Sequence, residues 1–348
     1  MSVPGLDLDR LLPWFQAHVA PVTELRAEII GHGRSNLTYR IEAGGRRWAL
    51  RRPPLSHVLP TAHDMAREFR VLSALANTDV PAPRPIAYCD DPQVNDRPFY
   101  VMEYVDGLVP ANAAEVAARF DEAQRRRIGE ELIDTLVKLH ALDPAAVGLA
   151  DFGRPQGFMA RQVRRFSEQL DRSRTRPVPE MDELQRRLAA AVPAESDAAI
   201  VHGDYRLDNA ILDDQGRIAA VLDWEMSTLG DPLADVGMLM MYWAEDQADG
   251  AATPSLSSIA VTALPGFPSR REALERYAQR SGRDLANLDF YLVFAYFKLA
   301  VILEGIHARY LQGGTVGEGF ERIGDQALVL ARRGLAVADR SAVAALRG

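Results

Sequence analysis

Apolar and polar residues alternate in two stretches near the start of the chain, which is the pattern of half-buried β-strands. Residues 37–43 (LTYRIEA) alternate, Gly44 and Gly45 form a turn signal, and residues 47–51 (RWALR) resume the strand pattern. Two such runs joined by a short glycine turn predict a β-hairpin. Residues 98–107 (PFYVMEYVDG) predict a further strand that ends in an acidic, glycine-containing turn.

A helical pattern lies between these strands. In residues 62–76, apolar side chains recur three or four positions apart, as on one face of a helix: Met65, Phe69, Leu72 and Leu75. Residues 80–89 contain several prolines and lead into another strand. The chain before Gly107 therefore predicts a part that mixes strands with one main helix.

After Gly107 the pattern becomes mainly helical. Apolar residues recur with the helical period in segments 127–142, 158–174, 271–282, 288–311 and 318–337. Short segments around the VHGD and VLDW sequences have strand character instead. The whole pattern is typical of an α+β protein with two lobes. We expect an N-terminal lobe at residues 1–106 and a C-terminal lobe at residues 107–348.

The composition argues against several classes of protein. The formal net charge is −8, which disfavours a nucleic-acid binder because a phosphate backbone requires a basic surface. The single cysteine, Cys89, allows no intrachain disulfide and no cysteine metal cluster, so we expect a cytoplasmic protein. The N-terminus lacks the cationic start and apolar core of a signal peptide. The longest apolar run, residues 290–303, is too short to span a bilayer and contains Lys298, so we expect a buried helix and no membrane.

The segment HGDYRLDN at residues 202–209 carries the first candidate chemistry. Asp204 and Asn209 have the H-x-D-x-x-x-x-N spacing of a kinase catalytic loop, and Asp223 follows in the apolar segment VLDWE. In that arrangement the first Asp accepts the proton of a substrate hydroxyl, while the Asn and the second Asp hold Mg²⁺ through hard oxygen atoms. Each residue alone could cap a turn or pair with a cation, but the ordered set favours catalysis. His202 is expected to brace the loop rather than to react.

The segment GHGRSNLTY at residues 31–39 is a candidate phosphate-binding loop. It is not a dinucleotide fingerprint, because Asn36 stands where the third glycine belongs and a strand follows. It is not a Walker A motif either, because no Gly-Lys-Ser/Thr follows. A hairpin loop over nucleotide phosphates fits better, and it makes Gly33, Ser35 and Asn36 candidate cofactor-binding residues. A plain hairpin turn explains the pattern equally well.

Further residues fit a nucleotide site in the same order along the chain. Arg51 lies on the strand after the loop and Glu68 on the following helix, as do the cation and the acid that orient the α- and β-phosphates in kinases. The alternative for Arg51 is a solvated strand end. The FYVMEYVDG strand looks like a hinge, and its backbone near Met102, Glu103 and Val105 could hydrogen-bond an adenine edge. A buried strand with a polar exit would show the same pattern.

With these motifs in order, the chain resembles the aminoglycoside phosphotransferase and choline kinase-like superfamily. HGDYRLDNAIL and VLDWEMSTLGDPLADVG carry the resemblance most specifically, and it covers residues 25–310. More narrowly, SNLTY, LRRPP, AHDMAREFRVL, FYVMEYVDG and LAVILEGIHARY are similar to a bacterial branch related to the kinase domains fused to acyl-CoA dehydrogenases. The resemblance implies a bilobal protein-kinase-like fold: a small antiparallel-sheet lobe with one main helix that binds nucleotide, and a larger, mainly helical lobe for catalysis and substrate binding. Relatives in that branch are associated with phosphorylation of hydroxyacyl-CoA substrates.

The resemblance also implies roles for individual residues. It makes Asp204 the catalytic base, Asn209 and Asp223 catalytic magnesium ligands, and Arg51 with Glu68 the phosphate-positioning pair. Arg51 departs from the usual lysine, and arginine is longer and forked, so the two are not interchangeable. The sequence DWE replaces the Asp-Phe-Gly of protein kinases, and no activation segment follows. That favours a small molecule over a protein as substrate.

The prediction is therefore an ATP- and Mg²⁺-dependent phosphotransferase that acts on a hydroxyl of a small molecule, with a hydroxyacyl-CoA favoured. Several arginines of the C-terminal part could meet an anionic acceptor group, although a solvated helix face explains any one of them better: Arg161, Arg164, Arg165 and Arg309. The alternatives are an aminoglycoside or other antibiotic O-phosphotransferase, a catalytically weak kinase-fold module that binds nucleotide, and a metal-dependent hydrolase. No nucleic-acid or membrane partner is expected, and the sequence indicates no oligomeric state.

Overall fold

The computed structural model describes residues 3–30, 36–55, 64–194, 197–245, 257–313 and 319–348. The chain divides into two units. The first unit comprises Met1–Val109, Val147–Leu149 and Asn209–Ser227, and the second comprises Pro110–Ala146, Ala150–Asp208 and Thr228–Gly348. The expected lobe of residues 1–106 thus ends just before the division at Val109, but a segment from the middle of the chain also belongs to the first unit.

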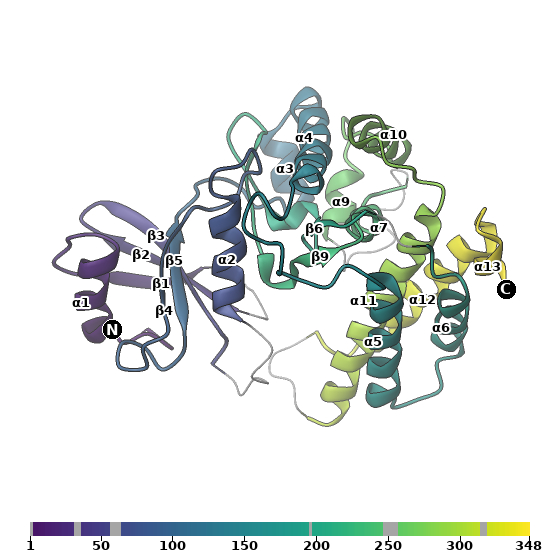
Figure 1. Ribbon diagram of the computed structural model, residues 1–348, viewed down its shortest axis with the longest axis horizontal. Helices are drawn as coiled ribbons and strands as arrows, with labels where there is room; N and C mark the ends of the chain where they lie inside the picture. Colours follow the sequence, from purple (N-terminus) through teal and green to yellow (C-terminus); the bar gives the residue numbers. More distant parts are fainter. Residues whose placement is uncertain (1–2, 31–35, 56–63, 195–196, 246–256, 314–318) are drawn as a thin grey trace. The chain divides into compact units, whose positions relative to one another are not determined.

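A five-stranded antiparallel sheet forms most of the first unit (Figure 1). Its strands, in spatial order, are β1 (Arg26–Ile30), β2 (Leu37–Ala43), β3 (Arg46–Arg52), β5 (Phe99–Glu103) and β4 (Pro85–Cys89). The predicted hairpin is β2–β3, and the expected hinge strand is β5, which pairs with β3 and β4. Gly44 and Gly45 turn the hairpin with φ of 55° and 76°, a conformation that glycine adopts without steric cost.

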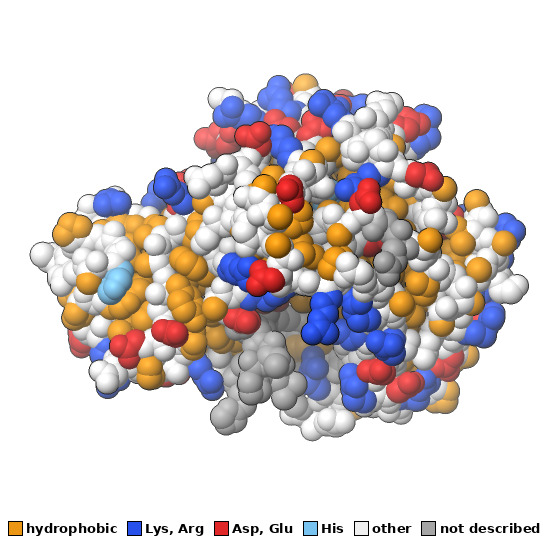
Figure 2. Space-filling view, in the orientation of Figure 1, with side chains coloured by type: hydrophobic (Ala, Val, Ile, Leu, Met, Phe, Trp, Pro, Cys, Tyr) orange, Lys and Arg blue, Asp and Glu red, His pale blue; other side chains and the backbone are white. Residues whose placement is uncertain are grey.

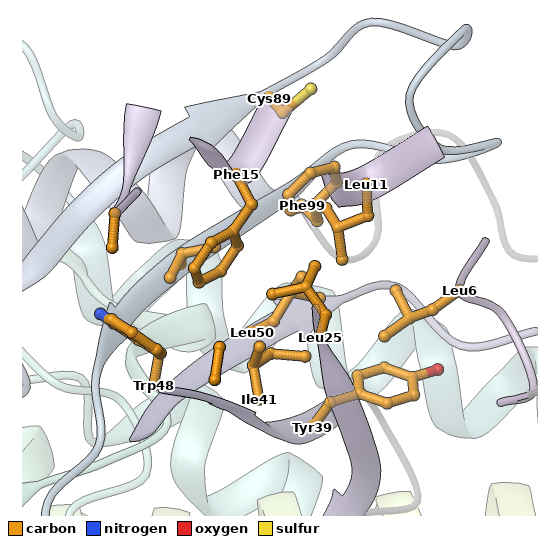
Figure 3. Packing of buried hydrophobic residues seen from close by; sticks show 13 residues of the cluster. Leu6, Leu11, Phe15, Leu25, Tyr39, Ile41, Trp48, Leu50, Cys89 and Phe99 are labelled. Carbon is orange, nitrogen blue, oxygen red and sulfur yellow. The ribbon is translucent and has the colours of Figure 1, made fainter. Parts of the chain in front are cut away.

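The hydrophobic core of the first unit lies on one face of this sheet. Helix α1 (Leu8–His18), which was not predicted, covers that face, and α2 (Met65–Leu75) lies on the other side (Figure 1). Figure 3 shows the packing, in which the Phe15 ring of α1 meets the Trp48 ring edge-on with centroids 5.1 Å apart. Because strand side chains alternate between faces, the neighbours Leu50 and Val101 are buried in this core while Arg51 and Tyr100 face the other way.

The segment Asn209–Ser227 completes the first unit. Strand β7 (Ala210–Leu212) pairs antiparallel with β8 (Ile218–Val221), and the 3₁₀ turn η2 (Trp224–Met226) follows and packs against α2. Leu212 and Leu108 exchange backbone hydrogen bonds of 2.8 and 2.9 Å. These contacts attach the segment to the chain that leaves β5.

The second unit is mainly helical. Its helices are α3 (Ala113–Arg119), α4 (Glu122–Ala141), α5 (Phe158–Ser173), α6 (Pro179–Ala190), α7 (Leu233–Met241), α9 (Ser257–Thr262), α10 (Arg270–Ser281), α11 (Leu288–Leu311), α12 (Ile323–Arg340) and α13 (Ala344–Arg347), with the short strands β6 (Ala199–Val201) and β9 (Thr228–Gly230). The helices predicted at 158–174, 271–282 and 288–311 are α5, α10 and α11. Helix α4 begins at Glu122, before the predicted residue 127, because Asp121 and Gln124 form a capping box there. Helix α6 was not predicted.

Helix α11 is the central helix of the second unit. Among the residues that the structure describes, it is the one helix long and apolar enough to cross a membrane. The helix is longer than the apolar run at residues 290–303 from which it was predicted. However, 72% of its most apolar window is buried, and the helix packs against α5, α6, α7 and α12. The expectation of a buried core helix is therefore confirmed by its burial rather than by its length.

Candidate functional site

The first unit contains a cavity of about 390 Å³, a size typical of small-molecule sites. Its wall is built by the α2-facing side of the sheet, by α2, by the chain after β5 and by the β7–η2 segment. The cavity brings together most of the predicted nucleotide-site residues: Asn36, Arg51, Glu68, Met102, Glu103, Val105, Asn209 and Asp223. Gly33 and Ser35 lie outside the described residues.

Arg51 is the central cation of this cavity. Its Nε lies 3.0 Å from a Glu68 carboxylate oxygen, and one terminal guanidinium nitrogen donates to Oδ1 of Asp223. The same terminal nitrogen is 3.9 Å from a carboxylate oxygen of Glu225. The predicted Arg51–Glu68 pair is therefore present, and the forked side chain also reaches the predicted metal-binding Asp. A single ammonium could not offer two separate nitrogen atoms to these partners.

Burial and charge act in opposite directions on this pair. Burial raises the pKa of Glu68 to about 7, against the attraction of the Arg51 guanidinium. Burial alone would lower the pKa of Arg51, but the carboxylates of Glu68, Asp223 and Glu225 outweigh it, so Arg51 stays charged. Tyr100 shares a hydrogen bond with Glu68, and burial, followed by that neighbouring carboxylate, raises the tyrosine pKa. Because the Glu68 side chain is only 2% exposed, removal of Arg51 would leave a costly buried acid.

The β7–β8 hairpin brings Asn209 and Asp223 to the same cavity. Asn209 immediately precedes β7, and its carbonyl accepts a 2.7 Å hydrogen bond from the N–H of Leu222 at the end of β8. Asp223 is the only non-glycine residue with positive φ in the described part of the chain (φ 66°, ψ 58°). Such a conformation costs on the order of 1 kcal/mol for a residue with a Cβ atom and is typical of functional sites.

The donors of these two residues suit Mg²⁺. Asn209 offers an amide oxygen and Asp223 a carboxylate, which are the hard ligands that Mg²⁺ prefers. The described residues contain no group of three or more His, Cys, Asp or Glu side chains that could hold a metal ion by itself. In nucleotide sites, Mg²⁺ takes most of its ligands from phosphates and water. The hydrogen bond from the Arg51 guanidinium shows that the Asp223 carboxylate can bind a positively charged group in this cavity.

Glu225 connects this site to the strand that follows the candidate phosphate loop. The buried side chain of Asn36 donates through Nδ2 to a Glu225 carboxylate oxygen at 2.9 Å. Asn36 was predicted to bind the cofactor, whereas no role was predicted for Glu225. The acid two positions after Asp223 in the DWE sequence was the available signal.

The chain after β5 supplies the expected hinge position. The backbone N–H of Glu103 donates to the Arg84 carbonyl at 2.8 Å, so it is not available to an adenine edge. Val105 lies outside the strand, and its backbone N–H makes no hydrogen bond with the described residues. Of the three backbone positions that the sequence suggested, Met102 and Glu103 lie within β5, and Val105 follows the strand with its N–H available.

The loop at residues 202–209 belongs mostly to the second unit, and Asp204 lies there. His202 is fully buried, and its Nδ1 accepts the Asp204 backbone N–H at 3.2 Å. The predicted bracing role of His202 is thus confirmed. The backbone N–H groups of His202 and Gly203 donate to the buried Asp235 carboxylate at 2.7 and 2.8 Å, and that carboxylate also contacts His140. Burial raises the Asp235 pKa, but these partners hold it below its ordinary value.

Arg206 holds the side chain of Asp204. Its Nε lies 3.2 Å from Oδ2 of Asp204, and a terminal nitrogen bonds Asp208. The guanidinium also lies over the Tyr242 ring, 5.1 Å from the ring centroid. Asp204 is 29% exposed, so the carboxylate is fixed but remains open to a substrate hydroxyl. The sequence analysis missed Arg206, although its place two residues after Asp204 in the loop was a signal.

Comparison with known proteins identifies the family. The model of the phosphotransferase enzyme family matches residues 26–291, which span the sheet, the cavity and the loop at residues 202–209. The chain belongs to this family. A solved structure from Ralstonia eutropha, provisionally called an aminoglycoside phosphotransferase, is 34% identical, with a TM-score of 0.80 over 96% of this chain and 98% of that one.

Other relatives extend this result. Acyl-CoA dehydrogenase family member 11 of Gallus gallus is 34% identical over 96% of this chain and 43% of its own length. A protein named probable acyl-CoA dehydrogenase IBR3, from Arabidopsis thaliana, is 33% identical over 88% of this chain and 39% of its own length. The chain thus spans less than half the length of these curated relatives. A thermostable mutant of the aminoglycoside phosphotransferase APH(4)-Ia is 14% identical, with a TM-score of 0.65 over 96% of this chain and 100% of that one, and shares the fold.

These findings confirm the fold class. The chain is a member of the phosphotransferase enzyme family with the protein-kinase-like fold, with an antiparallel-sheet unit and a mainly helical unit. The resemblance to kinase domains fused to acyl-CoA dehydrogenases is confirmed by the curated relatives.

Proposed function

We propose that the protein transfers the γ-phosphoryl group of ATP, with Mg²⁺, to a hydroxyl group of a small molecule. One observation carries the proposal: a single cavity collects the Arg51–Glu68 pair together with Asn209 and Asp223. A separate structural role for each residue would not require them to line the same space. The order of these residues along the chain is also that of kinases.

Each residue of the cavity has a part in this reaction. Arg51, oriented by Glu68, binds the α- and β-phosphates, and Asn209 and Asp223 hold Mg²⁺ through their oxygen atoms. When bound, Mg²⁺ neutralises charge on the transferring phosphoryl group. The adenine ring packs against the apolar wall of the cavity, and its edge accepts a hydrogen bond from the Val105 N–H. The wall consists of Ile30, Ala49, Leu72, Met102 and Ile211. Catalysis is then mainly positioning and charge stabilisation.

Asp204 acts as the general base in this proposal. Its carboxylate accepts the proton of the acceptor hydroxyl as that oxygen attacks the γ-phosphorus and the bond to the β-phosphate oxygen breaks. Arg206 fixes the carboxylate from one side at 3.2 Å. The Asp204 backbone N–H is fixed by His202, so both the main chain and the side chain of the base are positioned.

The acceptor is proposed to be a hydroxyacyl-CoA. The names of the curated relatives include an acyl-CoA dehydrogenase. Figure 2 shows several Lys and Arg side chains over α5. Arg164 and Arg165 of this helix are exposed, and neither has a carboxylate within 4.0 Å among the described residues, whereas Arg161 bonds nearby backbone carbonyls. Their charge suits an anionic acceptor rather than a polycationic aminoglycoside.

The test is Mg²⁺-dependent ADP formation with a panel of acceptors: hydroxyacyl-CoAs, aminoglycosides, choline-like alcohols and sugars. We expect hydroxyacyl-CoAs to stimulate ADP formation, with no effect of the other classes. Asp204→Asn should lower kcat by about a thousandfold, the range of general-base catalysis. Asp214→Asn, at an exposed position of the β7–β8 turn, is the matched control and should behave as wild type.

Other outcomes would support the alternatives. Stimulation by aminoglycosides alone would identify an antibiotic phosphotransferase. Nucleotide binding without stimulation by any acceptor would favour a catalytically weak binding module. Phosphate release from substrates in the absence of nucleotide would indicate a hydrolase and contradict the proposal.

A further inference from the structure

Helix α11 carries one buried cation, Lys298, in an otherwise apolar stretch. The residue is 9% exposed, and its ammonium nitrogen donates to the Gly203 carbonyl at 2.8 Å. It also lies 5.9 Å from the centroid of the Phe166 ring of α5. No salt bridge joins it to a carboxylate within 4.0 Å in the described part of the chain. An apolar residue would pack in this helix at lower cost, because burial of an ammonium is expensive.

The atom that Lys298 binds belongs to the peptide group that joins Gly203 to Asp204. The N–H of that same peptide group donates to His202 Nδ1 at 3.2 Å. Side chains therefore bind both polar groups of this peptide: Lys298 of α11 binds its carbonyl oxygen, and His202 of the loop binds its N–H. The φ of Gly203 is 85°, and its own N–H donates to Asp235 of α7. The peptide group before Asp204 is thus held at both of its polar atoms, and the preceding peptide group is held by Asp235.

The charges around Lys298 agree with a role at this loop. Burial lowers the pKa of Lys298, and the carboxylates of Asp204 and Asp235 oppose that shift. Arg165 of α5 is the neighbouring cation and acts in the same direction as burial. The carboxylates that act on Lys298 therefore belong to the loop and to its support in α7.

We propose that Lys298 is a positioning residue that sets the orientation of Asp204 by holding the Gly203 carbonyl. This inference rests on the proposed role of Asp204 as general base. Without the ammonium, the peptide group can rotate about its neighbouring bonds, and the carboxylate no longer points consistently at the acceptor hydroxyl. Lys298 does not line the nucleotide cavity, so the effect should fall on turnover and not on ATP binding.

The experiment compares Lys298→Met and Lys298→Arg with wild type. Lys298→Met should lower kcat by about a hundredfold, the usual effect of a misplaced catalytic group. KM for ATP and calorimetric affinity for a nonhydrolysable ATP analogue should stay within about twofold, since the nucleotide site is intact. Lys298→Arg keeps a charged donor, so its kcat should be about tenfold or more above that of Lys298→Met. Lys138→Met, at an exposed position of α4, is the matched control and should leave kcat unchanged.

Hydrogen–deuterium exchange gives a readout that does not depend on turnover. The Asp204 amide should exchange faster in Lys298→Met than in wild type, with unchanged exchange in β6. Wild-type exchange and wild-type kcat in Lys298→Met would overturn the inference, as would a loss of nucleotide affinity equal to the loss of kcat. Equal kcat for the Met and Arg variants would also overturn it. If Lys298→Met does not fold, Lys298→Gln is measured by the same criteria.

These results separate the inference from the proposed function. Wild type without acceptor-dependent turnover, or a fully active Asp204→Asn variant, would contradict the proposed function. A dead Asp204→Asn variant beside a fully active Lys298→Met variant would contradict only the role of Lys298.

Discussion

At the scale of single residues, the choice of arginine at position 51 determines how the cavity is arranged. The Arg51 fork reaches Glu68 and Asp223 through different nitrogen atoms. The sequence order was enough to predict the pair with Glu68, because strand cation and helix acid follow each other in kinases. The bond to Asp223 could not be predicted, since it depends on where the β7–β8 hairpin packs. The same holds for the contact between Asn36 and Glu225.

The raised pKa of Glu68 gives a testable pH dependence. Its folded-state value of about 7 lies above the ordinary 4.5, so folding favours the protonated carboxyl. This contribution to the free energy of unfolding is complete below pH 4.5 and is lost as the pH rises through about 7. Glu68→Gln removes it. The stability of wild type relative to Glu68→Gln should therefore fall between pH 5 and pH 8, by at most about 3 kcal/mol.

Urea unfolding of both proteins at each pH measures this difference. Glu103→Gln, at the exposed last residue of β5, is the control and should show no such trend relative to wild type. A wild-type advantage that stays constant or grows with pH would mean that the Arg51 charge, and not burial, controls the titration of Glu68.

At the scale of elements, the contact between α7 and α11 requires a glycine. A Cβ atom on Gly237 of α7 would lie 2.5 and 2.6 Å from the carbonyl carbon and oxygen of Tyr291 in α11. The backbone cannot move away without separating the two helices. The tight packing also places Asp235 of α7 and Lys298 of α11 at the same loop, so this contact supports the loop that carries Asp204.

Gly237→Ala should therefore lower the free energy of unfolding by about 2 kcal/mol, the usual cost of overpacking. The matched control is Gly305→Ala in α11, where the nearest atoms, in Gln169 and Ser173, are 3.9 Å from the added Cβ. That change should be neutral or stabilising by about 0.5 kcal/mol, because alanine is the better helix former. The measurement is the midpoint of urea unfolding for each variant, compared with that of wild type. Equal midpoints would show that α7 and α11 are not closely packed.

The elements differ in how well the sequence predicts them. Helix α5 and helix α10 were predicted because apolar residues recur there with a clear helical period. Helix α1 was missed, and Pro13 within it obscures the helical pattern. The α6 pattern was present, since Met181, Leu184 and Leu188 are buried at helical spacing, but it was overlooked. Strands β6 and β9 have three residues each, which is too short for alternation to be recognised.

At the scale of the whole molecule, the sequence predicted one boundary, whereas the chain crosses between units several times. Residues Asn209–Ser227 return to the first unit, and this segment carries the predicted metal ligands. No local sequence pattern predicts that this segment packs with the first unit, because the packing depends on tertiary contacts such as the Leu108–Leu212 pairing. The kinase spacing nevertheless predicted that Asn209 and Asp223 would share a site. The convergence of Asp204 with them stays a prediction.

The measurement that tests the central claim most directly is calorimetric titration of Asp223→Asn with Mg²⁺ and a nonhydrolysable ATP analogue. Asparagine tolerates the left-handed conformation of residue 223, so the change removes a charge without straining the backbone. The affinity should fall by about tenfold or more relative to wild type, because a neutral amide oxygen replaces the charged carboxylate that binds Mg²⁺. Asp204→Asn, titrated in the same way, should bind within about twofold of wild type, because a base is not needed for binding. Unchanged affinity in Asp223→Asn would contradict a Mg²⁺–nucleotide site in this cavity.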